Sequence, residues 1–290
     1  MNKYLKNIGI NAQKAFEKKI DTKIKNKVLD KFAYLINKNK FKIINQNKKD
    51  VNFAKKKGIK ENLLRRLILD IDKIEQIIKS IKIIIKLKDP IDITLSQSKR
   101  PNGLRIKKVT IPLGVIGIIY ESRPNVTSDV SSLCFKSGNS IILRGGSEAY
   151  FSNKILANLF RKALKDNKVD PNYVQFIESR NRRLVDILLS KMEKYIDLVI
   201  PRGGKNLVKK VLKLSSVPII GHLEGICHTY IDKDASLSSA VKIIYNAKLR
   251  NTSICGATET ILIHEKCLKK FVNPVLKKLI TKGCIIFADK

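Results

Sequence analysis

The stretch IPLGVIGIIYESRPNVTSDVSSLCFKSGNSIILRGGSEA, residues 111–149, decides the fold. Within it, residues 115–120 and 140–143 are short, almost wholly apolar runs of the kind that form buried strands. Residues 125–136 between them read as a helix that begins near Pro124, because proline suits the first turn of a helix. Two buried strands joined by a helix indicate parallel strands with a right-handed crossover.

The same alternation of strand and helix continues downstream. It predicts an α/β protein built on a Rossmann-type open parallel sheet with helices on both faces, followed by a second α/β domain. Because residue 290 follows directly on the last expected strand, we expect that second domain to be incomplete in this chain. The further strands are expected at 173–177, 198–200, 217–220, 229–231, 259–263 and 284–287, and the helices at 147–164, 182–192, 205–214, 235–249 and up to 280.

Upstream of residue 90 the apolar residues recur at helical spacing, and Asp89-Pro90 ends that helical region. Residues 91–108 are polar and extended, with a turn at Pro101-Asn102-Gly103 between two short strands. Such a hairpin is either a surface flap or an arm that reaches a neighbouring subunit. The expected domains are thus a helical lead-in (1–90), an extended arm (91–108), the sheet domain (109–248) and the start of a second domain (249–290).

The formal charge of +34 comes from 59 Lys+Arg against 25 Asp+Glu, and it raises the question of a polyanionic partner. The lysines are spread along the predicted helices, arginine is absent before Arg65, and aromatic residues make up 6% of the chain. A nucleic-acid binder would use clustered arginine and stacked aromatics. The pattern therefore favours a compositional bias over nucleic-acid binding, although the charge by itself leaves that alternative open.

Targeting and metal signals are missing from the sequence. No run approaches the roughly 20 apolar residues that span a bilayer, and we expect no membrane association. The N-terminus lacks the apolar core of a signal peptide. Five irregularly spaced cysteines indicate reduced thiols in the cytoplasm, and the histidines and cysteines show no metal-ligand spacing.

Open parallel sheets bind ligands beyond the carboxyl ends of their strands, so the turns there are the candidate sites. Glycine and the first turn of a helix can hold a phosphate group, but tight strand–helix turns need glycine as well, and both explanations stay open. Glu224, in the loop at 221–225, is either a surface carboxylate or a substrate contact. The turns in question are Glu121-Ser122-Arg123-Pro124-Asn125, Arg144-Gly145-Gly146-Ser147, Pro201-Arg202-Gly203-Gly204-Lys205 and Asn251-Thr252-Ser253-Ile254-Cys255-Gly256.

Cys255 differs from the other four cysteines, which fall in predicted helices and strands and read as small buried residues. It lies in a polar loop before Gly256, where a thiol beside backbone N–H groups can be activated as thiolate. Its position alone leaves open whether it is catalytic.

At these turns the sequence resembles the γ-glutamyl-phosphate reductase family, a branch of the aldehyde dehydrogenase superfamily. The residues that carry the resemblance run from one end of the chain to the other. They are KNIGINAQKAF (6–16), residues 111–149 as quoted above, YIDLVIPRGGKNLV (195–208), GHLEGICHTYIDKDA (221–235) and NTSICGATETILIH (251–264).

The resemblance implies roles for individual residues. Cys255 matches the family's nucleophile, and Asn125 matches the asparagine whose amide helps to form the oxyanion hole. Arg144 falls where the superfamily has a lysine that contacts the adenosine ribose or its 2′-phosphate, which suits NADP(H). The remaining expected cofactor contacts are Gly145, Gly146, Ser147, Gly203 and Gly204. Our candidates for binding the substrate phosphate are Arg123 and Arg202.

The superfamily's general-base glutamate has no clear equivalent, because Ile220 or Gly221 falls near its place. That absence suits a reductase, in which no water attack on a thioester is wanted, and it argues against an oxidising aldehyde dehydrogenase. The resemblance implies NADPH-dependent reduction of L-glutamyl 5-phosphate to L-glutamate 5-semialdehyde in proline biosynthesis. It also implies a cytoplasmic enzyme that forms a homo-oligomer when it is full length, with glutamate 5-kinase as a possible partner. The alternative is a truncated, inactive fragment of that enzyme, since family members run well beyond 290 residues.

Overall fold

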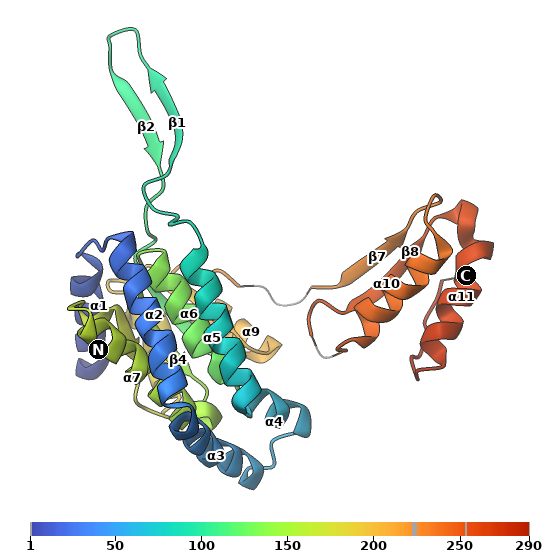
Figure 1. The fold of residues 1–290 in the computed structure, drawn as a ribbon, viewed down its shortest axis with the longest axis horizontal. Coiled ribbons are helices and arrows are strands. Elements are labelled where there is room, and N and C mark those ends of the chain that lie inside the picture. The colour runs from blue at the N-terminus through green and yellow to red at the C-terminus, as the bar shows by residue number, and fades with distance from the viewer. Residues whose placement is uncertain (1, 222–224, 253, 290) are drawn as a thin grey trace. The chain divides into compact units, whose positions relative to one another are not determined.

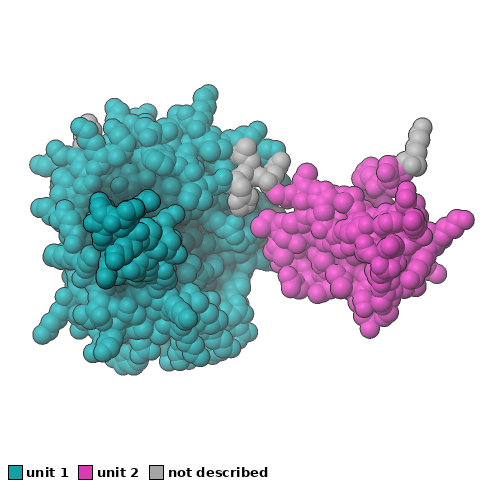
Figure 2. Space-filling model, turned by 90° about the horizontal axis from the view of Figure 1, so that it is seen from above, with its two compact units in different colours: residues 1–221 teal, residues 222–290 magenta. Residues whose placement is uncertain are grey.

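The computed structural model describes residues 2–221, 225–252 and 254–289 (Figure 1). The chain divides into two compact units, Met1–Gly221 and His222–Lys290, which Figure 2 colours separately. The start of the second domain predicted from the sequence, residue 249, lies later than this division. The difference arises because the strand and helix between 227 and 249 pack on the core of the second unit.

The first unit is built on a parallel sheet, as the sequence predicts. Its strands follow the order β5-β4-β3-β6, and every neighbouring pair is parallel. The run at 217–220 is not a full strand, because it forms a single bridge, between Val199 and Ile219. The four strands are β3 (Val115–Tyr120), β4 (Ser140–Gly145), β5 (Val174–Phe176) and β6 (Leu198–Arg202).

Helices cover both faces of this sheet, and alternate residues of each strand explain how. Ile116 and Ile118 of β3 join the core formed with α2, α5, α6 and α7, whereas Val115 and Ile119 join the core formed with α1, α8 and α9. The helices are α1 (Lys3–Phe16), α2 (Thr22–Lys38), α3 (Lys40–Lys56), α4 (Glu61–Leu67), α5 (Ile71–Lys86), α6 (Pro124–Lys136), α7 (Tyr150–Asp166), α8 (Arg183–Lys191) and α9 (Lys205–Leu214), with short 3-10 turns at Ser147–Ala149 and Pro171–Tyr173.

The hairpin is formed by β1 (Thr94–Lys99) and β2 (Arg105–Val109), which pair antiparallel. Every residue of both strands is exposed, and in Figure 1 the hairpin projects away from the helices of its unit. Leu95 and Ile106 are among the apolar side chains that it exposes. The predicted pair of strands around Pro101-Asn102-Gly103 is confirmed.

The second unit contains β7 (Cys227–Ile231) and β8 (Thr258–Ile263), which are parallel, with α10 (Leu237–Leu249) and α11 (Leu268–Ile280). The strand predicted at 284–287 is wrong. Cys284 and Ile286 do pack on the core while Ile285 and Phe287 are 82% and 93% exposed, which is the alternation of a strand. Within the described part of the unit, however, no strand lies alongside to pair with this segment.

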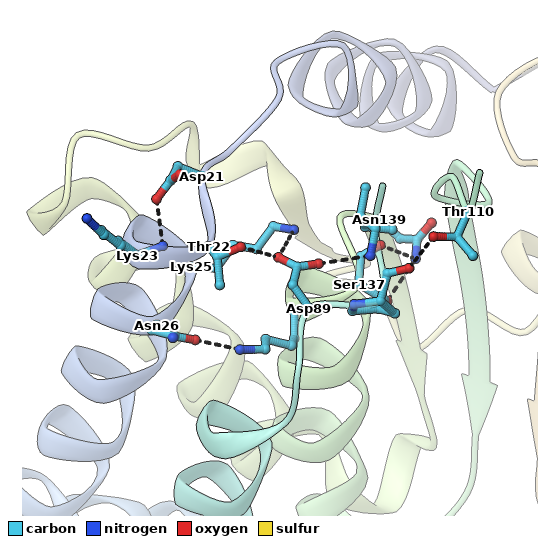
Figure 3. Close-up of polar contacts among 12 residues, drawn as sticks. Asp21, Thr22, Lys23, Lys25, Asn26, Asp89, Thr110, Ser137 and Asn139 are labelled. Carbon is cyan, nitrogen blue, oxygen red and sulfur yellow. Dashed lines mark hydrogen bonds and ion pairs between the residues drawn. The ribbon is translucent and has the colours of Figure 1, made fainter. Parts of the chain in front are cut away.

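A polar network lies where α5 runs into the hairpin (Figure 3). Lys25 is 4% exposed, and its Nζ lies 2.9 Å from Asp89 Oδ2, which also accepts a hydrogen bond of 2.7 Å from Thr22 Oγ1. The other Asp89 oxygen accepts a hydrogen bond from the backbone N–H of Ile91. These contacts fix the start of the hairpin to α2.

A second network holds the start of α7, which directly follows the turn at 144–149. The fully buried Asp50 carboxylate on α3 accepts hydrogen bonds from the backbone N–H groups of Phe151 and Ser152 and from the Ser152 hydroxyl. Burial raises the pKa of Asp50, and the hydrogen bonds from Ser152 and Phe151 oppose that rise. Asn47, one helical turn earlier, bonds to Ser152 Oγ and to the backbone of Leu67 and Leu69.

Candidate active site

Three of the four candidate turns meet at the carboxyl edge of the sheet. The register pairs Tyr120 of β3 with both Gly145 of β4 and Arg202 of β6, and Glu121 N–H donates a hydrogen bond of 3.1 Å to the Arg202 carbonyl. The turns that follow these strands therefore start side by side, which is where an open parallel sheet binds its ligands. The fourth turn, with Cys255, belongs to the second unit.

Arg144 is the last residue but one of β4, and it is only 6% exposed. Its guanidinium donates to the carbonyl of Gly145, while its buried Nε has no hydrogen-bond partner among the described residues. Burial lowers the pKa of Arg144, and the nearby Glu148 carboxylate opposes that shift. An arginine still remains charged at neutral pH, so the site holds a fixed positive group with a donor unsatisfied.

Glu148 is a residue of this site that the sequence analysis did not single out. Its carboxylate accepts hydrogen bonds from the backbone N–H and the hydroxyl of Ser122, at 3.0 and 2.7 Å, and from Ser147 Oγ at 3.4 Å. Burial raises the pKa of Glu148, but these hydrogen bonds outweigh it and lower the pKa on balance. Glu148 is therefore an ionised carboxylate that ties the turn after β3 to the turn after β4.

Three of the four glycines in the two Arg-Gly-Gly turns have close neighbours within the protein, whereas Gly204 does not. A Cβ on Gly145 would lie 2.2 Å from Asn153 Nδ2, and one on Gly146 would lie 2.2 Å from Glu148 Oε1. A Cβ on Gly203 would lie 2.7 Å from the carboxylate of Glu121. Tight packing therefore explains these three glycines without any ligand.

Glu121 occupies the N-terminus of α9. Its Oε2 accepts a hydrogen bond of 2.9 Å from the backbone N–H of Gly204, the residue that precedes the helix. A helix N-terminus attracts anions through its free N–H groups and its partial positive charge. A negatively charged oxygen is thus already bound at the turn where the sequence analysis placed a phosphate contact.

Asn125 occupies the first turn of α6, directly after Pro124. It is half-buried, and its Nδ2 donates a hydrogen bond of 3.0 Å to Oδ2 of Asp129, one helical turn further on. An amide nitrogen carries two hydrogens, so one remains for another acceptor. Of the two arginines proposed for a substrate phosphate, Arg123 precedes α6 and is half-buried, and Arg202 ends β6 and is exposed.

Cys255 is exposed, in a turn between α10 and β8. The turn is closed by a hydrogen bond from Ala257 N–H to the Ile254 carbonyl. The Cys227 thiol donates a hydrogen bond of 3.2 Å to the Cys255 carbonyl oxygen. Cys134 and Cys267 are buried, as expected, whereas Cys227 and Cys284 are only half-buried. Cys227 thus helps to hold the Cys255 turn against the start of β7, a contact that spacing along the sequence cannot reveal.

Three further predictions concern Glu224, metal binding and membrane association. Glu224 lies outside the described residues. Among the residues that are described, no group of His, Cys, Asp and Glu side chains could hold a metal ion. None of the helices in that part of the chain has the length and apolar character needed to cross a bilayer.

Residues 5–282 match the aldehyde dehydrogenase family. The γ-glutamyl phosphate reductase of Thermodesulfovibrio yellowstonii is 42% identical over 275 residues, which make up 93% of this chain and 66% of the relative. The chain therefore spans about two thirds of the length of such a relative.

Solved structures agree. The crystal structure of γ-glutamyl phosphate reductase from Thermotoga maritima superposes with a TM-score of 0.90 at 39% identity, covering 96% of this chain and 68% of that one. The corresponding yeast structure, from Saccharomyces cerevisiae, gives a TM-score of 0.70 at 34% identity and covers 98% and 71%. The chain belongs to the aldehyde dehydrogenase family and, within it, to the γ-glutamyl phosphate reductases.

Proposed function

We propose that this chain carries the cofactor-binding and nucleophile-bearing part of an enzyme that reduces L-glutamyl 5-phosphate to L-glutamate 5-semialdehyde with NADPH. The observation that supports this most directly is the similarity to γ-glutamyl phosphate reductases over 93% of the chain, which includes the turn with the exposed Cys255. The thiol, together with the amide and the arginines at the strand ends, supports this reaction class.

Cys255 would act as the nucleophile. Its thiolate attacks the C5 carbonyl of the acyl phosphate, the C5–O bond to the phosphate breaks, and phosphate leaves with the electron pair of that bond. The product is a thioester on Cys255. NADPH, when bound, supplies the hydride that reduces this thioester to a thiohemiacetal. The C–S bond then breaks, and the aldehyde and the thiolate are released.

Asn125 and the arginines would stabilise the charges that develop in this reaction. The second amide hydrogen of Asn125 can donate to the tetrahedral oxyanion, together with the backbone N–H of Cys255. One such donor is typically worth about 3–4 kcal/mol of transition-state stabilisation. Arg123 and Arg202 are the candidates that would neutralise the departing phosphate.

The sheet edge offers groups that could bind a dinucleotide. Gly204 N–H already binds a carboxylate oxygen at the N-terminus of α9, so the same group could bind a pyrophosphate oxygen. Arg144, with its unsatisfied Nε, would be the contact to the adenosine ribose or its 2′-phosphate, with Gly145, Gly146 and Ser147 in the adjacent turn. Access to Arg144 requires a side-chain movement, because the guanidinium is buried.

A prediction follows from the place of Glu121. A pyrophosphate at Gly204 would have to displace the Glu121 carboxylate, so Glu121→Gln should tighten the binding of NADP(H) by about two- to five-fold, the worth of one charge at a helix end. The change in NADPH fluorescence as the chain is added measures this affinity. Asp166→Asn removes one negative charge at the far end of α7 and serves as the control. Weaker binding in Glu121→Gln would contradict the competition.

The reaction itself is tested by NADP reduction in the reverse direction, with the purified chain, glutamate 5-semialdehyde and inorganic phosphate. We expect absorbance at the NADPH wavelength to rise beyond one equivalent of the chain only when phosphate is present, because phosphate must attack the thioester to free Cys255 for the next turnover. The control omits phosphate and keeps the same ionic strength with chloride. The absence of turnover would favour the alternative that these 290 residues are an inactive part of the enzyme.

The wider setting is proposed on the same grounds. The exposed hairpin β1–β2 would pair with a neighbouring subunit of a homo-oligomer, since its strands leave backbone groups and apolar side chains uncovered. The free cysteines are consistent with a cytoplasmic enzyme of proline biosynthesis, which could receive its unstable acyl phosphate from glutamate 5-kinase.

A further inference from the structure

One stripe of α6 stays outside the core of the first unit. Asn125, Asp129 and Leu133 follow one another at intervals of four residues and so share one face of the helix. The first two are half-buried and Leu133 is 48% exposed, whereas Ser128, Ser131 and Ser132 of the same helix are fully buried. The stripe begins at the proposed oxyanion donor and leads away from it along the helix.

Asp129 is a half-buried carboxylate that has no ion-pair partner among the described residues. Its one side-chain contact among the described residues is the hydrogen bond from Asn125 to Oδ2, and none of the ion pairs there involves it. Burial raises the pKa of Asp129, and the hydrogen bond from Asn125 lowers it only in part. In a chain with 59 lysines and arginines, a permanent partner would be easy to supply. Asp89, by contrast, has Lys25.

The spacing between Asn125 and Asp129 matches the size of a glutamyl group. Asn125 Nδ2 and Asp129 Oδ2 lie 3.0 Å apart, and the second carboxylate oxygen, Oδ1, extends the site beyond Oδ2. Four covalent bonds separate C5 of a glutamyl group from its α-nitrogen, about 5 Å when extended. A substrate whose C5 oxygen is held by Asn125 can therefore place its α-ammonium group at Asp129.

We propose that the Asp129 carboxylate binds the α-ammonium group of the glutamyl substrate and thereby selects an α-amino acid over a plain dicarboxylic chain. This assignment rests on the proposed function, which puts the reacting C5 carbonyl at Asn125. Oδ2 keeps its hydrogen bond from Asn125, and Oδ1 accepts from the ammonium, which has three donors. Burial makes an unpaired Asp129 carboxylate unfavourable, so a cation bound beside it would be stabilising.

The competing explanation is that Asp129 only orients the Asn125 amide. In that case its loss would weaken binding or turnover of every substrate to the same degree, with or without an α-ammonium group. A comparison of two ligands that differ only in that group separates the two roles.

The test measures binding and does not need turnover. L-Glutamine and glutaramate share a neutral C5 carbonyl and an α-end carboxylate, but glutaramate lacks the α-ammonium. We expect the wild-type chain to prefer L-glutamine by about ten- to hundred-fold in dissociation constant, as a charge-assisted hydrogen bond would give. In Asp129→Asn, which retains the shape of the side chain, the two constants should agree within about two-fold.

Ligand-observed NMR titration of the full chain gives both constants in the millimolar range, and thermal melts check that Asp129→Asn is folded. Asp166→Asn, with the same loss of charge at an exposed ion pair, should keep the wild-type preference. Equal affinities of the wild-type chain for the two ligands, including no binding of either, overturn the assignment, as does a preference that survives in Asp129→Asn. Failure of the phosphate-dependent assay with this preference intact would count against catalysis by the chain and not against Asp129.

Discussion

Cys255→Ser is expected to abolish phosphate-dependent NADP reduction while it leaves the affinity for NADP(H) within about two-fold of wild type. A serine hydroxyl stays protonated at neutral pH and is a far weaker nucleophile than a thiolate, and nucleophile loss commonly lowers kcat by several orders of magnitude. Cofactor affinity should persist because the proposed contacts at Arg144 and Gly204 lie in the first unit and Cys255 lies in the second.

Cys284→Ser is the matched control, since that half-buried thiol lies in the same unit and has no proposed role in catalysis. Residual turnover above about 1% of wild type in Cys255→Ser would rule out Cys255 as the nucleophile. Alkylation provides a readout without turnover. Iodoacetamide should modify the exposed Cys255 first and the buried Cys134 and Cys267 last, and mass spectrometry of peptides from the treated chain identifies the sites.

The sheet and the strand-end turns could be predicted because their signals are local. Residues 115–120 and 141–143 are apolar without interruption, and both strands are buried throughout, as a strand covered on both faces must be. Once such strands are parallel, the turns that follow them must meet at one edge. The exposed turn of Cys255 was likewise visible in the polar residues around it.

What the sequence could not reveal depends on contacts between distant residues. Glu148 with Ser122, Glu121 with Gly204 and Cys227 with Cys255 join positions that lie 26 to 83 residues apart. Nothing in the spacing of these residues marks the partner. The segment 284–287 fails for a related reason, because its alternating pattern specifies a strand but the strand that would pair with it is a tertiary feature.

Lys25→Met should give a large loss of stability, about 3 kcal/mol in the free energy of unfolding, because it removes the ion-pair partner of the partly buried Asp89 carboxylate and leaves it with the more distant charge of Lys136. Methionine matches the length of the apolar stem of lysine, so the packing against α5 is kept. Urea denaturation followed by circular dichroism measures the effect. Lys23→Met, two residues earlier and exposed, should stay within about 0.5 kcal/mol of wild type.

The cause of that loss can be separated from the loss of packing in two ways. Lys25→Met combined with Asp89→Asn removes the uncompensated charge and keeps an oxygen for Thr22, so the double variant should recover at least half of the lost stability. A double variant no more stable than Lys25→Met would show that charge is not the cause.

The pH dependence gives the second separation. Burial by itself raises the pKa of Asp89, but the hydrogen bonds from Thr22 and Lys25 lower it below the ordinary value of 3.8. The stabilisation from the Asp89 carboxylate is therefore complete above that pH and is lost as the pH falls through the lowered pKa of the folded state. Without Lys25, Asp89 protonates more readily. At low pH, protonation therefore removes the free-energy cost of keeping an unpaired carboxylate there. The difference in stability between wild type and Lys25→Met should accordingly be largest at neutral pH and shrink as the pH drops below 3.8, because protonated Asp89 no longer needs the lysine.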